Sequence, residues 1–381
     1  MKAEEFVQQM SQCGVDYYTG VPDSLLSPLC GELLKRCGTE AQKHVVAANE
    51  GGAVALAAGH YLATGRPAVV YLQNSGIGNI INPVCSLIHD EVYGLPVVFV
   101  VGWRGEPQTK DEPQHRFQGK VTRELLDCVG IDNVVVTAET DAEQFRKMLL
   151  DCAGHLKEGR PFAFVIAKGA LEGETNFKQA RAFPLSREQA VEVVLRQETE
   201  NAFYVSTTGK LSRELFELRE RNGQGHEKDF LTVGSMGHSV MIALGIAAAH
   251  PDKQIICLDG DGAALMHMGN IAVAGSCGCG NLTEIVFNNS AHESVGGVPT
   301  VGDRVDFGAV AAAYGYKTAR RVETAEELEA ALLETAGKEG PHFLEVMINL
   351  DVRKELGRPT RTPKENRDAF MERLQGKERG L

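Results

Sequence analysis

Two short polar motifs follow apolar stretches in the second half of the sequence, and their residues suit a phosphate and a divalent cation. The triplet Gly-Asp-Gly at 260–262 follows one such stretch, and Asn288 and Asn289 follow the next. Glycines let a backbone pass close to a phosphate, and a helix that starts near Ala263 would point its N-terminal amides at the anion. Asp261 and Asn289 carry hard oxygen atoms, which are the ligands that Mg²⁺ prefers.

A dinucleotide-binding turn is an alternative interpretation of the same triplet. Gly260 and Gly262 fit the first two positions of a GxGxxG motif, but the third position, 265, is leucine. An aspartate inside the phosphate loop would also repel a pyrophosphate unless a cation lay between them. The triplet followed by two asparagines, with residues 263–287 between them, is the more specific pattern.

The elements that must position these motifs alternate between short β-branched strands and helices, which is typical of parallel α/β architecture. Parallel sheets bind ligands at the carboxyl ends of their strands, where both motifs fall. A polar, aperiodic stretch at 169–183 predicts a linker, so we expect two doubly wound parallel-sheet domains, at 1–180 and 181–381. The expected strands are 44–46, 68–72, 96–101, 134–136, 162–166, 202–205, 230–233, 254–258, 284–287 and 343–348, with helices at 51–64, 78–89 and near the C-terminus.

Composition and charge exclude several classes of function. The 381 residues are 43% hydrophobic and 24% charged, which is enough for two full hydrophobic cores. A net charge of -12 argues against a nucleic-acid surface, because phosphate contacts need clustered lysines and arginines. We expect a cytoplasmic protein outside the membrane, because the chain starts on an amphipathic helix, has no long apolar run and scatters its nine cysteines.

The spacing of the two motifs resembles that of the thiamine-diphosphate enzymes, in which they flank a magnesium site. The resemblance implies that Asp261, the Asn289 side chain and the Ala291 carbonyl bind Mg²⁺. It also implies that the Gly234 carbonyl accepts from the cofactor's 4′-amino group and that Met236 holds the two rings in a V, although Met236 could equally be core packing. Thr208 and Gly209 join the candidates because they follow a predicted strand, and the full set of candidate cofactor-binding residues is Glu50, Thr208, Gly209, Gly234, Ser235, Met236, Gly260, Asp261, Gly262, Ala263 and Asn289.

Glu50 is the best catalytic candidate in the first half of the chain. It follows a predicted strand and opens an Ala-rich helix, and it resembles the glutamate that hydrogen-bonds N1′ of the cofactor's aminopyrimidine. A carboxylate in that role must be protonated part of the time, so we expect partial burial to raise its pKa. Taken alone, a glutamate at a helix N-terminus is simply a partner of the helix dipole.

The resemblance covers essentially the whole chain, and it implies a pyrimidine-binding first domain and a diphosphate-binding second domain. In this family the active site forms between subunits, so a homo-oligomer is implied. The thiazolium ring of such a cofactor is the electron sink for decarboxylation of a 2-oxo acid.

The compact two-domain form narrows the resemblance to phosphonopyruvate and sulfopyruvate decarboxylases. Strings at 19–24, 111–115, 289–294 and 356–366 look like the former, which implies 3-phosphonopyruvate as the substrate and phosphonoacetaldehyde as the product. A small anionic 2-oxo acid needs polar groups on both sides of its pocket, and we expect Asp23, His115 and His292 to supply them. Each could instead be a solvated loop residue or a helix cap. A sulfopyruvate decarboxylase and a non-catalytic nucleotide-binding α/β protein remain as alternatives.

Overall fold

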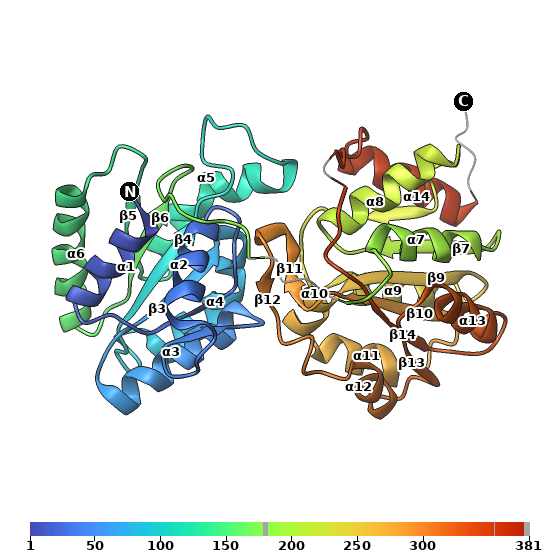
Figure 1. Cartoon of the computed structure of the whole chain (residues 1–381), viewed down its shortest axis with the longest axis horizontal. Coiled ribbons are helices and arrows are strands. Elements are labelled where there is room, and N and C mark those ends of the chain that lie inside the picture. Colours follow the sequence, from blue (N-terminus) through green and yellow to red (C-terminus); the bar gives the residue numbers. More distant parts are fainter. Residues whose placement is uncertain (178–181, 354, 377–381) are drawn as a thin grey trace. The chain divides into compact units, whose positions relative to one another are not determined.

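The computed structural model describes residues 1–177, 182–353 and 355–376, which form two compact units. The amino-terminal unit contains residues 1–177 together with Val295–Pro299, and the carboxyl-terminal unit contains the other described residues. The boundary expected between residues 180 and 181 lies outside the described residues. In both units, helices flank a central sheet (Figure 1).

The amino-terminal unit is built on a six-stranded sheet with the strand order β2-β1-β3-β4-β6-β5. Every neighbouring pair is parallel, so each connection must cross over the sheet, usually through a helix. The elements are α1 (Ala3–Gln12), β1 (Tyr18–Gly20), α2 (Ser27–Cys37), β2 (His44–Val46), α3 (Glu50–Thr64), β3 (Ala68–Gln73), η1 (Asn74–Gly76), α4 (Ile77–Pro83), η2 (Val84–Ile88), β4 (Val97–Gly102), α5 (Pro113–Cys128), β5 (Asp132–Val136), α6 (Ala142–Lys157), β6 (Phe162–Ile166) and β12 (Val298–Pro299).

The two faces of this sheet bury different helices, because successive side chains of a strand point to opposite faces. In β3, Val69 and Tyr71 pack with α1, α2 and α6, whereas Val70 and Leu72 pack with α3, α4 and α5. A sheet that is covered on both faces needs strands that are apolar throughout, and β4 shows this in its buried run 97–101.

The carboxyl-terminal unit repeats this architecture with the strand order β13-β14-β10-β9-β7-β8, again with parallel neighbours. Helices α7, α8 and α13 cover one face, and α9, α11, α12 and α14 contribute to the core on the other. No helix in the described ranges is long and apolar enough to cross a membrane. The elements are α7 (Arg187–Arg196), β7 (Ala202–Ser206), α8 (Lys210–Arg221), β8 (Asp229–Leu231), α9 (Ser239–Ala249), β9 (Gln254–Gly260), α10 (Asp261–Met266), α11 (Gly269–Ser276), β10 (Leu282–Asn288), β11 (Ala291–His292), η3 (Glu293–Val295), α12 (Phe307–Ala313), β13 (Thr318–Val322), α13 (Ala325–Thr335), β14 (His342–Met347) and α14 (Pro363–Gln375).

The predicted fold class, two doubly wound parallel sheets, is confirmed, but several elements differ from expectation. The helix expected at 78–89 is divided: α4 ends at Pro83 and a π-helical segment, η2, follows it. Proline has no N–H to donate, so the regular hydrogen-bond ladder cannot continue through it. Strands β1 and β13 were not expected, since β1 has three residues and β13 is an edge strand that contains two arginines.

Candidate active site

The residues predicted to bind the cofactor lie at one edge of the carboxyl-terminal sheet. Strands β8, β7, β9 and β10 are consecutive neighbours, and their carboxyl ends open onto that edge. Residues 234–237 follow β8, residues 208–209 follow β7, residues 260–263 span the junction of β9 and α10, and residues 289–291 follow β10. Strand order therefore brings together four segments that are far apart in the sequence.

Asp261 is the first residue of α10 and is 3% exposed. Its Oδ2 accepts a hydrogen bond from the Thr300 hydroxyl. Burial raises the pKa of Asp261 to about 7. In the described part of the chain, a hydroxyl and backbone N–H groups oppose this shift, and no cationic side chain does. A divalent cation beside this carboxylate would hold it ionised, so its surroundings suit a metal ligand.

Asn288 and Asn289 have different neighbours. The Asn288 amide nitrogen donates to the Gly302 carbonyl at 2.8 Å and to the Glu345 carboxylate at 2.7 Å, and its oxygen accepts from the N–H and hydroxyl of Ser290 at 3.0 Å. Asn288 therefore has a structural role, because it links the segments that contain Ser290, Gly302 and Glu345. Asn289 is 4% exposed, and among the described residues its side-chain oxygen accepts the N–H of Ala291 at 3.1 Å, so Asn289 is the candidate ligand of the two.

Backbone strain is concentrated in the same segments. Of the three non-glycine residues with positive φ in the described chain, Ser235 (54°) and Ser290 (55°) lie in the predicted cofactor segments, and Gln108 lies in a loop of the other unit. Side chains disfavour this left-handed region, and residues held in it gather at ligand-binding sites.

His292 lies against the predicted cofactor segments. A Cβ added at Gly262 would stand 3.2 Å from the His292 ring and 3.5 Å from Met236 Cε, so both side chains lie close to Gly262. His292 is half-buried, and burial lowers its pKa to about 4, so its imidazole is neutral at pH 7. A neutral imidazole beside this site can donate one hydrogen bond and accept another.

The segment after β7 keeps its backbone accessible while the neighbouring lysine is paired. Gly209 is exposed with a φ of 101°, and Thr208 is half-buried. The Lys210 ammonium donates to Glu293 Oε1 at 2.7 Å, and Arg187 donates to Glu293 Oε2 at 2.6 Å. The positive charge of Lys210 is therefore paired with the Glu293 carboxylate.

Glu50 is the first residue of α3, after the N-cap Asn49 whose side chain accepts from Gly51 N–H at 2.8 Å. Glu50 is 4% exposed, and its Oε2 accepts from Asn79 Nδ2 at 2.6 Å. Any side chain in place of Gly76 would overlap the Glu50 carboxylate. Burial raises the pKa of Glu50, which is the expected direction, and the Asn79 hydrogen bond opposes the shift.

Asp23 and His115 lie at the same edge of the amino-terminal sheet as Glu50, in segments after β1 and β4. Asp23 is 1% exposed and accepts from Leu25 N–H at 2.8 Å and from Gln73 Nε2 at 2.5 Å. His115, in the first turn of α5, is 8% exposed, and its Nδ1 is buried with no hydrogen-bond partner among the described residues. Burial lowers its pKa, with a further contribution from Arg104.

Arg104 is a residue of this edge that the sequence did not single out. It lies two residues after the end of β4, and its guanidinium pairs with Asp111 at 2.6 Å. In the sequence, only its position shortly after a continuously apolar strand could have indicated this residue, because it belongs to no recognisable motif.

The residues present fit Mg²⁺ only in combination with oxygen atoms from elsewhere. In the described ranges, no three His, Cys, Asp or Glu side chains come together as a ready-made metal site. Asp261, the Asn289 amide and the Ala291 carbonyl would supply about half of an octahedral shell. Mg²⁺ in proteins commonly takes few protein ligands and completes its shell with phosphate oxygens and water.

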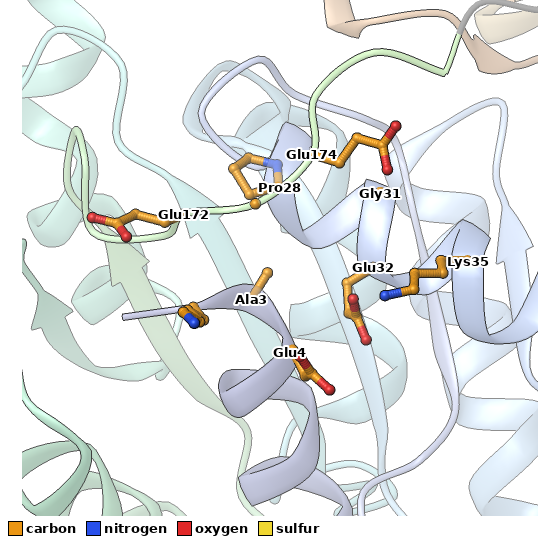
Figure 2. A pocket seen from close by; sticks show the side chains of 10 residues that line it. Ala3, Glu4, Pro28, Gly31, Glu32, Lys35, Glu172 and Glu174 are labelled. Carbon is orange, nitrogen blue, oxygen red and sulfur yellow. The ribbon is translucent and has the colours of Figure 1, made fainter.

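A pocket in the amino-terminal unit is lined by residues that were not predicted to belong to the active site (Figure 2). Its charged lining groups are Lys2, Glu4, Glu32, Lys35, Glu172 and Glu174. Glu32 is already paired with Arg36. The lining carries charges of both signs and includes none of the predicted site residues, so it has no evident link to the chemistry.

Comparison with known proteins places these features in a family. Residues 2–126 match the N-terminal TPP binding domain of thiamine pyrophosphate enzymes, and residues 207–346 match the C-terminal TPP binding domain. The phosphonopyruvate decarboxylase of Streptomyces viridochromogenes is 33% identical over 380 residues, which cover 95% of this chain and 92% of the relative. That of Streptomyces hygroscopicus is 32% identical over 389 residues, covering 98% and 94%. The sulfopyruvate decarboxylase of Methanosarcina acetivorans is 24% identical over 369 residues, covering 91% and 90%.

Proposed function

This chain belongs to the thiamine-diphosphate-dependent decarboxylases, a family of lyases, and we propose that it decarboxylates 3-phosphonopyruvate to phosphonoacetaldehyde and carbon dioxide with Mg²⁺ as its second cofactor. The observation that carries the substrate assignment is the nearly full-length similarity to two phosphonopyruvate decarboxylases. When bound, thiamine diphosphate supplies the electron sink that a 2-oxo acid needs in order to lose carbon dioxide.

In this proposal, Glu50 exchanges a proton with the N1′ atom of the cofactor. Burial raises the pKa of its carboxyl group, which favours the protonated form, so the group can exchange a proton with a nitrogen at hydrogen-bond distance. Asn79 and the space left by Gly76 fix the orientation of the carboxyl group. Pre-organisation of this kind lowers the cost of the proton transfer.

The edge of the carboxyl-terminal sheet would hold the cofactor's diphosphate and the V-shaped bend between its two rings. Asp261, the Asn289 side chain and the Ala291 carbonyl would bind Mg²⁺, and the buried carboxylate of Asp261 supports this assignment. The bend and the diphosphate would lie against Thr208, Gly209, Gly234, Ser235, Met236, Gly260, Gly262 and Ala263.

Asp23, His115 and His292 would form the polar wall around the substrate. The two histidines have lowered pKa values, so each can donate a hydrogen bond to a substrate oxygen while remaining uncharged. The orphaned Nδ1 of His115 is a group whose partner would be the substrate. Asp23 would then steer the proton that replaces the lost carboxyl group.

We further propose that the enzyme is a homo-oligomer with active sites between subunits. In the amino-terminal unit, α3 exposes Ala55, Leu56 and Leu62 together with two glycines, and no charged side chain interrupts that face. In the carboxyl-terminal unit, α9 carries no polar side chain after Ser239 and exposes Ala248 and Ala249. Exposed apolar faces of this kind mark protein–protein contacts, and a second copy of the chain would cover both.

The test is decarboxylation by the purified protein with thiamine diphosphate and Mg²⁺, offering 3-phosphonopyruvate, sulfopyruvate and pyruvate in parallel. We expect 3-phosphonopyruvate to lead by about a hundredfold in kcat/KM, which corresponds to about 2.7 kcal/mol of transition-state discrimination. A preference for pyruvate, or no turnover of any of the three, would contradict the proposal.

Sulfopyruvate is the second candidate substrate. The Methanosarcina relative aligns over 90% of its length, so the single-chain, two-unit organisation does not by itself favour phosphonopyruvate. A preference for sulfopyruvate in the same assay would overturn the assignment of the substrate and of the polar wall around it, and would leave the cofactor assignments in place. A protein that bound no thiamine diphosphate in the presence of Mg²⁺ would instead support the non-catalytic nucleotide-binding alternative.

A further inference from the structure

Arg104 connects the segments that carry Asp23 and His115. Its guanidinium donates to Asp111 through Nε at 2.9 Å and Nη2 at 2.6 Å, and to the Ser24 hydroxyl through Nη1 at 2.9 Å. The two charged side chains are 20% and 15% exposed. A single planar group thus links the loop after β4 to the loop after β1.

Asp111 gathers the loop after β4 around this guanidinium. Besides the two bonds from Arg104, its carboxylate accepts the N–H of Gly105 and the N–H of Glu112, each at 2.8 Å. Burial opposes ionisation, but Arg104 and these N–H groups hold the pKa of Asp111 well below its usual range. The loop is therefore closed by an ionised carboxylate immediately before α5, the helix that bears His115.

The backbone around Arg104 is fixed as well. Asn74 donates to the Arg104 carbonyl at 2.8 Å, accepts from the Arg104 N–H at 3.2 Å and donates to Thr122 of α5 at 2.9 Å. Trp103 donates its indole N–H to the Gly119 carbonyl at 2.8 Å. The chain on both sides of the guanidinium is thus docked on α5.

Contact between the loop and α5 is close enough to require glycine. Gly105 has a φ of 68°, and a Cβ there would overlap the His115 carbonyl. A Cβ at Gly119 would overlap the Gly105 carbonyl. A displacement of the loop would therefore move the first turn of α5 and its imidazole with it.

We propose that Arg104 is a positioning residue: by joining Ser24 to Asp111 it fixes the Asp23 carboxyl group and the His115 imidazole at the separation that proton transfer to the substrate requires. The inference rests on the proposed function, since Asp23 and His115 are the groups placed there at the substrate. Arginine suits the role because its planar fork makes three directed bonds at once, which a lysine ammonium on a flexible stem cannot reproduce.

The experiment compares Arg104→Lys, Arg104→Ala and Asp111→Asn with wild type, each as holoenzyme and with whichever 2-oxo acid the wild type turns over. We expect kcat to fall at least tenfold in all three, because each breaks the link, while the rise in Tm caused by thiamine diphosphate and Mg²⁺ stays unchanged. Arg116→Met, at an exposed arginine on the same helix, is the matched control and should keep wild-type kcat. Millimolar guanidinium should restore part of the kcat of Arg104→Ala.

A second readout separates positioning from a simple charge effect. The charged groups that act on His115 are Arg104, Asp111, Asp23 and Glu112. Arg104→Ala removes a cation and should raise the His115 pKa, whereas Asp111→Asn removes an anion and should lower it, as followed by NMR of the histidine rings. If charge alone mattered, the two variants would shift the pH profile of kcat in opposite directions and keep the plateau, whereas positioning predicts that both lose the plateau.

Two results would overturn the inference. Wild-type kcat in Arg104→Lys would remove the need for the planar fork and would leave the proposed function standing. Unchanged His115 ring shifts and pKa in all three variants would show that the link does not reach the imidazole, and this measurement needs no turnover. A wild type inactive on every 2-oxo acid would count against the proposed function, and the NMR arm would then decide the positioning role.

Discussion

Glu50 and Asp261 are both buried carboxylates with raised pKa values, but they have different neighbours. Glu50 is held by an amide and enclosed against a glycine, surroundings that leave it free to take up and release a proton. Asp261 lies among a hydroxyl and backbone N–H groups, surroundings that a cation would complete. A buried carboxyl group therefore suits a proton at the edge of the amino-terminal sheet and a metal ion at the edge of the carboxyl-terminal sheet.

Replacing Glu50 by glutamine should abolish most turnover while leaving the cofactor bound. The amide keeps the shape and a hydrogen bond but cannot exchange a proton, and such a loss typically costs about 10²- to 10⁴-fold in rate. The measurements are kcat and the thermal shift on adding thiamine diphosphate with Mg²⁺. Glu124→Gln, at an exposed position, is the control. Wild-type kcat in Glu50→Gln would remove Glu50 from the mechanism.

Asp261→Ala should act on binding rather than on the chemical step. Without the carboxylate, the Mg²⁺ dependence of cofactor binding should weaken by about 10- to 100-fold or more, the range found when the surroundings of a metal are disturbed. Titration of thiamine diphosphate at several Mg²⁺ concentrations measures this, with the exposed Asp303→Ala as control. An unchanged Mg²⁺ dependence would refute the metal assignment.

Single residues differ in how far the sequence could predict them. Asp261 and Glu50 stand in recognisable motifs, so their position at the ends of strands could be anticipated. Arg104 stands in none, because its role depends on Ser24, Asn74 and Asp111, which only the folded loops bring to it.

At the level of elements, the sequence predicted the buried strands well because a sheet covered on both faces needs continuous apolar runs. It failed for β13, whose residues 318–322 carry two arginines and lie at the sheet edge, where one side of the strand faces solvent. It also predicted one helix across 78–89, because periodicity does not reveal where Pro83 removes a hydrogen bond and a π-helical turn takes over.

A buried acid inside β10 should make stability depend on pH. Glu284 is 0% exposed, accepts from the Tyr316 hydroxyl, and burial raises its pKa to about 8. Because the folded pKa exceeds the unfolded one, this group's contribution to stability is complete below about pH 4.5 and is lost as pH rises towards 8.

Glu284→Gln should remove that dependence while keeping an acceptor for Tyr316. The free energy of unfolding of the wild type should fall between pH 5 and 8 by up to about 1.4 kcal/mol per pH unit on account of this group, and the variant should show a flatter profile. Urea unfolding at pH 5.5, 7 and 8.5 tests this, with the exposed Glu326→Gln as control. Parallel profiles for wild type and variant would contradict the assignment.

At the level of the whole molecule, the apolar faces of α3 and α9 predict self-association. Ala55→Arg, on the exposed face of α3, would place a charge in a contact with a second copy and should lower both the mass in solution and the turnover. Analytical ultracentrifugation measures the first and the decarboxylation assay the second. Leu150→Arg, on the exposed side of α6, is the control because Leu150 is an exposed apolar residue that belongs to neither face. Unchanged mass in Ala55→Arg would exclude this face of α3 from the contact.

The chain leaves the amino-terminal unit after Phe177, returns to it at Val295 and leaves it again after Pro299. On its return, Val295 and Val298 enter the core of that unit, and the Gly296 carbonyl accepts from the Phe177 N–H at 2.7 Å. A polypeptide that ended at Phe177 would therefore lack part of its own interior, and a single proteolytic cut between the units would leave a fragment of one inserted in the other. The amino-terminal unit is therefore not encoded by one continuous stretch of the gene. Exchanging it between related enzymes requires that residues 1–177 and 295–299 be exchanged together.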